Sequence, residues 1–108
     1  MAGARSHRLA EPVVPTSGGV TAITVPAGQT WLLKNLPVYN GGAVGSGVIV
    51  RLDTPASTTQ VVAAKSAPPG VTTQLLDGLV VLEAGDVLTV ASASSSLVCW
   101  FFGAKLTA

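Results

Sequence analysis

Short apolar runs alternate with clusters of Gly, Pro, Asp and Ser along the chain, which is the pattern of β-strands joined by turns. No sustained stripe of apolar residues has helical spacing, and the 12 Gly and 7 Pro recur too often to leave long helices intact. The apolar runs predict strands near residues 20–25, 30–39, 47–53, 59–65, 71–76, 79–83, 86–92 and 96–106. About eight short strands in one domain predict an all-β fold, a two-layer antiparallel β-sandwich of jelly-roll-like form.

Two segments share one turn pattern. Residues 25–31 have the sequence V-P-A-G-Q-T-W, and residues 82–88 have the sequence L-E-A-G-D-V-L. In each, an apolar strand end is followed by a two-residue turn and then by a glycine, where a left-handed backbone is favoured. We therefore predict positive φ at Gly28 and Gly85, two equivalent corners between the sheets, and a clash for a Cβ at either position.

The parity of apolar positions separates two kinds of strand. Residues 47–52 place Val48, Val50 and Leu52 on one face and Ile49 and Arg51 on the other, as in a half-buried strand. Residues 97–102 are apolar on both faces, with Leu97, Cys99 and Phe101 on one and Val98, Trp100 and Phe102 on the other. One face can fill the core. The other needs a cover, either the N-terminal arm or a neighbouring subunit, because an exposed uncharged strand would aggregate.

The first 18 residues differ from the rest of the chain. They contain two of the prolines and few apolar residues, so we predict an extended arm over residues 1–18 and a sandwich domain over residues 19–108. Such a segment is expected to be too polar to fold on itself in a free monomer and to lie across a neighbour. The contacts predicted for it are docking of Val13 and Val14, with Arg5 and Arg8 facing acidic groups.

Charge is scarce in this chain. Asp, Glu, Lys and Arg make up 10% of the residues, against roughly a quarter in an ordinary soluble domain, while 48% are apolar and the mean hydropathy is +0.57. Much of the folded surface is therefore expected to be covered by other subunits, which predicts a homo-oligomer. A net charge of +1 gives no global field for nucleic acid. Charges and prolines interrupt the apolar runs, which argues against a signal peptide and a transmembrane helix.

Little in the sequence supports catalysis or a cofactor. The single histidine, His7, lies in the predicted arm, and the serines of residues 92–96 are typical of a turn. Cys99 alternates with apolar residues and is predicted to be a buried small hydrophobe; one His and one Cys do not make a zinc site. A carboxylate pair, Asp77 and Asp86, sits at turns, where a domain this small offers little cleft for a glycosidase. Residues 40–45 lack the Lys-Ser/Thr of a phosphate loop and are predicted to form a hairpin loop.

The two turn segments also carry a family resemblance. With V-P-A-G-Q-T-W-L-L-K at residues 25–34 and L-E-A-G-D-V-L-T-V-A-S at residues 82–92, the chain resembles small β-sandwich virion proteins of tailed bacteriophages over residues 20–106. That resemblance implies a non-enzymatic structural protein, a head decoration or tail-associated component that multimerises on the particle with copies of itself and other virion proteins. It implies synthesis in the host cytoplasm and a place in the virion, with no membrane or nucleic-acid partner.

An alternative stays open. Five aromatics could stack on sugar rings, which is how a carbohydrate-binding adhesion module for a host glycan works; these are Trp31, Tyr39, Trp100, Phe101 and Phe102. If the chain is a structural subunit, we predict no catalytic, metal-binding or cofactor-binding residues in it. Its predicted interface residues are Arg5, Arg8, Val13, Val14, Val98, Trp100 and Phe102, and its structural turn residues are Gly28 and Gly85.

Overall fold

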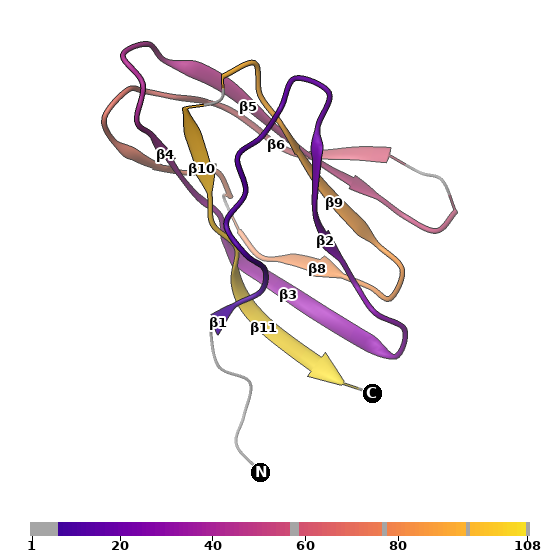
Figure 1. The fold of residues 1–108 in the computed structure, drawn as a ribbon. Helices are drawn as coiled ribbons and strands as arrows, with labels where there is room; N and C mark the ends of the chain where they lie inside the picture. The colour runs from indigo at the N-terminus through magenta and orange to yellow at the C-terminus, as the bar shows by residue number, and fades with distance from the viewer. Residues whose placement is uncertain (1–6, 57–58, 77, 95, 108) are drawn as a thin grey trace.

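Strands form all the regular structure that is described. The computed structural model describes residues 7–56, 59–76, 78–94 and 96–107, and in these ranges no helix is long and apolar enough to cross a membrane. The strands, labelled in Figure 1, are β1 (His7–Arg8), β2 (Val20–Thr24), β3 (Gln29–Asn35), β4 (Pro37–Asn40), β5 (Ser46–Asp53), β6 (Thr59–Ala67), β7 (Thr72–Gln74), β8 (Val80–Leu82), β9 (Val87–Ala91), β10 (Leu97–Cys99) and β11 (Phe102–Thr107).

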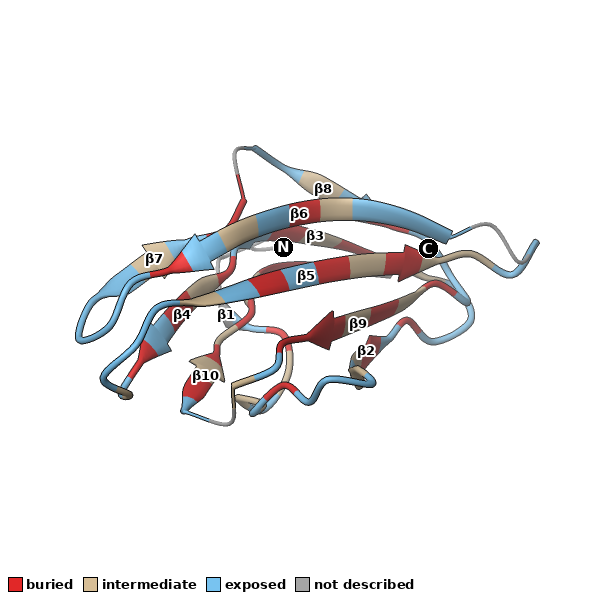
Figure 2. Ribbon diagram, turned by 90° about the horizontal axis from the view of Figure 1, so that it is seen from above, coloured by how far each residue is buried: buried red, intermediate tan, exposed pale blue. Residues whose placement is uncertain are grey.

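These strands make two layers. One layer is the antiparallel sheet β2-β9-β5-β6. The other combines the sheets β1-β11-β3-β8 and β10-β4-β7, since β3 runs into β4, and β10 into β11, almost without interruption. Buried residues of both layers alternate with exposed ones along the strands (Figure 2) and meet in one core. The predicted all-β antiparallel sandwich is confirmed.

The strand order follows a Greek-key path. Counting β3 with β4, β7 with β8 and β10 with β11 as single interrupted strands, and residues 7–13 as the first, one layer has the order first, eighth, third, sixth. The facing layer has the order second, seventh, fourth, fifth. Except for the consecutive fourth and fifth strands, neighbours in each layer are not consecutive along the chain.

Two of the predicted strands are interrupted at a shared point. The predicted strands 30–39 and 96–106 each divide in two, at Leu36 and at Trp100 with Phe101. Pro37 lacks an N–H group and cannot continue the ladder as a donor, although its carbonyl accepts from the Trp100 N–H at 3.0 Å. The Leu36 N–H donates instead to the side-chain oxygen of Gln74 at 2.6 Å. Both strands therefore bend together at this position.

The two predicted corners lie side by side. Each connects one layer to the other, β2 to β3 and β8 to β9, and the Val25 N–H donates to the Asp86 carbonyl at 3.0 Å while the Gly85 N–H donates to the Val25 carbonyl at 2.9 Å. Gly28 has φ +78° and Gly85 has φ +86°, in agreement with the prediction. The predicted clash holds only for Gly85, where a Cβ would lie 2.7 Å from Cγ of Pro55; at Gly28 the prediction was wrong because the space is open.

The loop after β4 is not a hairpin, contrary to the prediction. It crosses between layers, because β4 pairs with β10 and β7 whereas β5 pairs with β6 and β9. The buried side chain of Asn40 organises this crossing: its Nδ2 donates to the carbonyls of Val44 and Ala67, both at 2.9 Å, and its Oδ1 accepts from the Gly42 N–H at 2.9 Å. A buried amide with several partners fixes a loop more firmly than turn glycines do.

The N-terminal segment packs on its own chain. Leu9 is 4% exposed and its N–H donates to the Phe101 carbonyl at 2.8 Å, while Val13 exchanges two backbone hydrogen bonds with Cys99. The prediction that this segment would not fold in a free monomer was therefore wrong for residues 7–16, because backbone pairing with the last strands adds to its small apolar content. The boundary at residue 18 stays a prediction, and Arg5 lies outside the described residues.

Candidate interaction surface

The strand segment from residue 97 to residue 102 has one core face and one outer face. Leu97, Cys99 and Phe101 are each 0% exposed, and Val98, Trp100 and Phe102 are partly buried. The sequence left open which alternate set of residues fills the core, and the structure shows that it is Leu97, Cys99 and Phe101. Three large apolar side chains are left on the outside of the sandwich.

These outer side chains form a continuous strip. The rings of Trp100 and Phe102 lie parallel, with centroids 6.3 Å apart and an interplanar angle of 2°. Val98 lies directly opposite Tyr39 in the β10–β4 pairing, so the two side chains share a face, and Tyr39 is 44% exposed. We call Tyr39, Val98, Trp100 and Phe102 the aromatic strip. Of its members, Tyr39 was not among the interface residues predicted from the sequence.

The N-terminal segment borders the aromatic strip. Arg8 pairs with Phe102 across the β1–β11 ladder, and its guanidinium lies 3.7 Å from the carboxylate of Glu11. Both charged side chains are well exposed, so this ion pair contributes little to stability. Val14 is 47% exposed, directly after Val13. The fold thus brings the described predicted interface residues to one edge, and their role as an interface stays a prediction.

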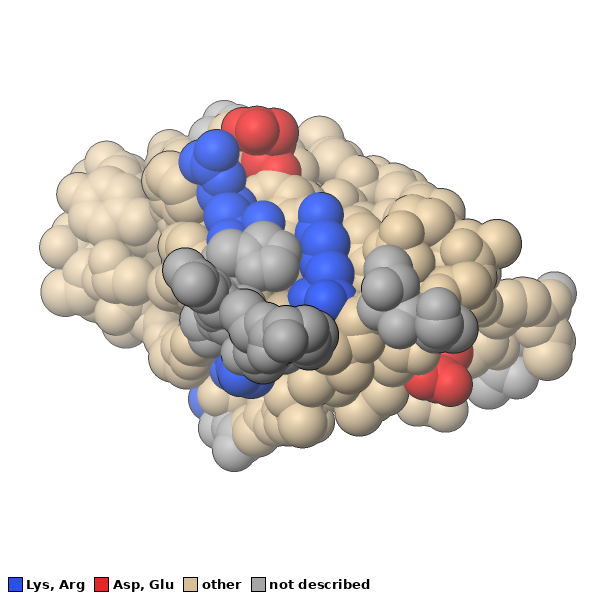
Figure 3. Space-filling view, turned by 90° about the horizontal axis from the view of Figure 1, so that it is seen from below, with Lys and Arg blue, Asp and Glu red and all other residues tan. Residues whose placement is uncertain are grey.

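Exposed apolar side chains also occur elsewhere on the described surface. The larger ones outside the aromatic strip and the N-terminal segment are Val44, Ile49, Val61, Val71, Leu79, Val81 and Leu106. On the face that Figure 3 shows, several Lys and Arg side chains lie close together on a surface that is otherwise mostly uncharged. Lys105 Nζ lies 4.3 Å from the centroid of the Trp31 ring.

The candidates for chemistry have structural roles in the described residues. Burial raises the pKa of the Cys99 thiol to about 12, so the thiol stays protonated and unreactive, and its predicted role as a buried small hydrophobe is confirmed. Asp86 accepts a hydrogen bond from the Glu83 N–H at 2.8 Å and thereby closes its turn, while Asp77 lies outside the described residues. No group of His, Cys, Asp and Glu in the described ranges has the geometry of a metal site.

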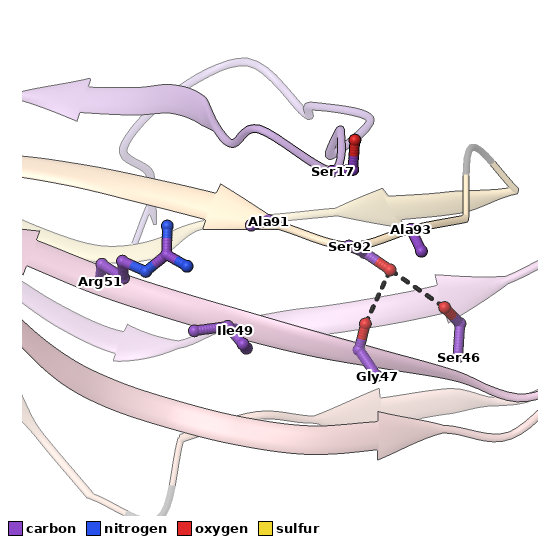
Figure 4. Close-up of a pocket in the computed structure, with 8 residues that line it drawn as sticks. All are labelled: Ser17, Ser46, Gly47, Ile49, Arg51, Ala91, Ser92 and Ala93. Carbon is purple, nitrogen blue, oxygen red and sulfur yellow. Dashed lines mark hydrogen bonds between the residues drawn. The ribbon is translucent and has the colours of Figure 1, made fainter.

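A shallow hollow lies on the opposite layer, where no site was predicted. It has a volume of about 340 Å³ and is formed by strands β5 and β9 with the loop before β2 (Figure 4). Its lining residues are Ser17, Ser46, Gly47, Ile49, Arg51, Ala91, Ser92 and Ala93. Strand parity had placed Ile49 and Arg51 on the outer face, but the pairing of β5 with β9 is long-range and has no local signal in the sequence.

The comparisons with known proteins give distant structural likenesses only. No protein-family model matches the chain, and no curated protein matches it either. Two solved pentameric capsid proteins from metagenomic phage sequences are similar to it, at 22% and 20% identity with TM-scores of 0.47 and 0.46. Each is matched by 92% of this chain, which spans 60% and 62% of those chains.

A third structure joins a carbohydrate-binding module to a catalytic module. It contains the CBM22-1 and GH10 modules of the Clostridium thermocellum endo-1,4-β-D-xylanase 10B complexed with xylohexaose, at 11% identity and a TM-score of 0.49. The match covers 92% of this chain and 24% of that one. At these identities and TM-scores we draw no functional conclusion from any of the three.

Proposed function

We propose that this protein is a non-enzymatic structural subunit of a tailed-bacteriophage particle, which multimerises with copies of itself and with other virion proteins. Its place would be that of a head decoration or a tail-associated component. The observation that carries the proposal is the aromatic strip, where Val98, Trp100 and Phe102 face outward from a segment whose alternate residues are wholly buried. The turn segments that resemble phage virion proteins support the same class.

The physical basis of such an assembly is burial. Apolar area contributes about 25 cal/mol for each Å² removed from water. A symmetric particle repeats one contact many times, so a modest interface on each subunit suffices to hold the particle together. The few charges of this surface, 10% of the residues, leave little to desolvate when subunits meet. The aromatic strip is a suitable centre for such a contact because Trp and Tyr dominate the energies of protein interfaces.

One observation favours a second candidate, a carbohydrate-binding adhesion module. The parallel, partly exposed rings of Trp100 and Phe102 could serve as a platform for stacked sugars. Trp31 and Phe101, by contrast, are buried and are not available for that role. We favour the assembly function because the strip also includes aliphatic Val98 and meets the N-terminal segment where Phe102 lies opposite Arg8. These neighbours extend an interface but add nothing to a sugar platform.

The experiment that tests the proposal is a protein inventory of purified phage particles from the genome that encodes this chain. Heads and tails are separated, and the chain is quantified by mass spectrometry in each fraction. We expect many copies in one of the two fractions. A chain that is expressed in infected cells yet absent from both fractions would refute the virion assignment. A monomeric protein that binds a host polysaccharide and needs Trp100 for it would favour the second candidate.

A further inference from the structure

The hollow on the β5–β9 face contains one basic side chain, Arg51, which has no acidic partner in the described part of the chain. Its neighbours across the sheet, Thr89 on β9 and Val61 on β6, carry no charge. Asp53, two residues further along β5, accepts a hydrogen bond from the Thr59 hydroxyl at 2.6 Å. Within the described ranges no hydrogen bond or ion pair joins Arg51 to another group. A partly buried arginine without a carboxylate partner is a suitable site for an anion.

The other end of the hollow presents a hydrogen-bond acceptor. Ser92 Oγ donates its single proton to the Gly47 carbonyl at 2.7 Å, so the 3.1 Å contact between the Ser46 and Ser92 hydroxyls must use the proton of Ser46. Ser46 Oγ is then left with lone pairs to offer to a ligand. Ser92 Oγ also accepts from the Ser94 N–H at 3.3 Å, which fixes its orientation.

The floor of the hollow is small and apolar. A Cβ on Gly47 would point to the same side of β5 as Ile49 and Arg51, and it would meet no atom within 4 Å. Ile49 and Ala91 supply carbon surface between the guanidinium and the hydroxyls, as Figure 4 shows. Ser46 and Arg51 are five residues apart on β5, or about 17 Å of extended chain. Allowing for the reach of the arginine, the gap is longer than one sugar ring.

We propose that this hollow binds a short acidic oligosaccharide, of about two rings. The guanidinium of Arg51 takes the carboxylate of a uronic acid residue, and the Ser46 Oγ accepts from a hydroxyl of the adjoining ring. The ring carbons lie over Ile49 and Ala91. A lone carboxylate satisfies only Arg51, and a neutral sugar leaves Arg51 unpaired with no aromatic ring in the lining to stack on. A ligand that carries both groups is therefore the one that uses both ends of the hollow. This site is distinct from the aromatic strip and goes beyond the proposed assembly function.

The test is isothermal titration calorimetry on the full chain, with digalacturonate as the probe. Neutral galactobiose and sodium acetate serve as comparison ligands, and both should bind roughly tenfold more weakly or worse. Arg51→Gln should weaken digalacturonate binding by at least a similar factor. Lys34→Gln, which removes a cation from the other layer, is the matched control and should leave the affinity unchanged. Gly47→Val fills the hollow without removing a charge and should also abolish binding.

Each outcome decides the proposal. Binding that requires Arg51 and an empty hollow, and prefers the acidic disaccharide to both comparison ligands, supports it. Equal affinity for acetate would overturn the sugar assignment, and equal loss in Lys34→Gln would show attraction by net charge alone. The absence of any binding heat with digalacturonate at about 50 mM would overturn the site itself, because that concentration lies far above a useful dissociation constant. None of the three variants is expected to change the sedimentation of the protein, so failure here leaves the assembly proposal intact.

Discussion

The two outer faces of this sandwich are built for different contacts. On the layer that contains β10 and β11, the aromatic strip presents large apolar side chains from a segment whose alternate positions are all core. On the opposite layer, β5 alternates buried valines with Gly47, Ile49 and Arg51, and the surface has a hollow lined mainly by small side chains and one arginine. The second face can remain exposed to water, whereas a broad apolar surface like the first favours association with another molecule. We infer that the first face is covered in the functional state, whereas the second remains open.

The largest expected effect is a difference in stability loss between the buried and the outward-facing side chains of residues 97–102. Phe101→Ala removes a wholly buried ring and should lower the free energy of unfolding by about 3–5 kcal/mol. Trp100→Ser removes a partly exposed ring of similar size and should cost far less stability while weakening assembly. Urea denaturation of both variants measures the difference. Equal losses of stability would mean that Trp100 belongs to the core and that the aromatic strip is misassigned.

A second prediction concerns the N-terminal segment. Leu9→Ala should destabilise the folded chain by about 2–3 kcal/mol because Leu9 is 4% exposed and packs in the core. Val14→Ala, at a 47% exposed position in the same segment, is the control and should change stability by less than about 0.5 kcal/mol. A chain that starts at Gly18 loses Leu9 and the pairing with Cys99, so it should also be less stable. Full stability of that truncated chain would refute the packing described above.

The paired corners give a smaller and graded effect. A Cβ at Gly28 would contact no other atom, so Gly28→Ala adds only the backbone strain of a positive φ. The free energy of unfolding should therefore fall by about 1–2 kcal/mol. Gly85→Ala adds the contact with Pro55 and should cost more. Thermal denaturation of the two variants, compared side by side, measures this order. Equal losses would show that Pro55 moves away freely, and the reverse order would contradict the assignment of the clash to Gly85.

Cys99 gives the smallest expected effect, which is confined to alkaline pH. Burial raises the pKa of its thiol from the ordinary value of 9.0 to about 12 in the folded chain. Above pH 9 the unfolded state therefore binds fewer protons than the folded state, and stability falls as pH rises toward 12. Cys99→Ala should lack this contribution. Denaturant titrations at several pH values test it, and a thiol reagent should leave the native protein unmodified near neutral pH.

Sequence patterns predicted local features well and long-range ones poorly. The alternation along β5, the two glycine corners and the buried Cys99 follow from period-two parity and turn chemistry, and the structure has them. The fate of Asn40 depended on partners at Val44 and Ala67, of which Ala67 lies 27 residues away, so local glycines misleadingly favoured a hairpin. The docking of the N-terminal segment and the hollow around Arg51 also arise from pairing between distant strands. Such pairing has no short-range signature in one sequence.

Sedimentation velocity of the purified chain, alongside Trp100→Ser, tests the central claim most directly. We predict that the wild-type chain sediments as an oligomer at micromolar concentration and that Trp100→Ser shifts it to a folded monomer. The removal of one aromatic anchor suffices for this because a few such residues dominate interface energies. A wild-type chain that stays a soluble, folded monomer at every concentration would contradict the claim that the aromatic strip is covered by another copy. So would an oligomer that Trp100→Ser leaves unchanged.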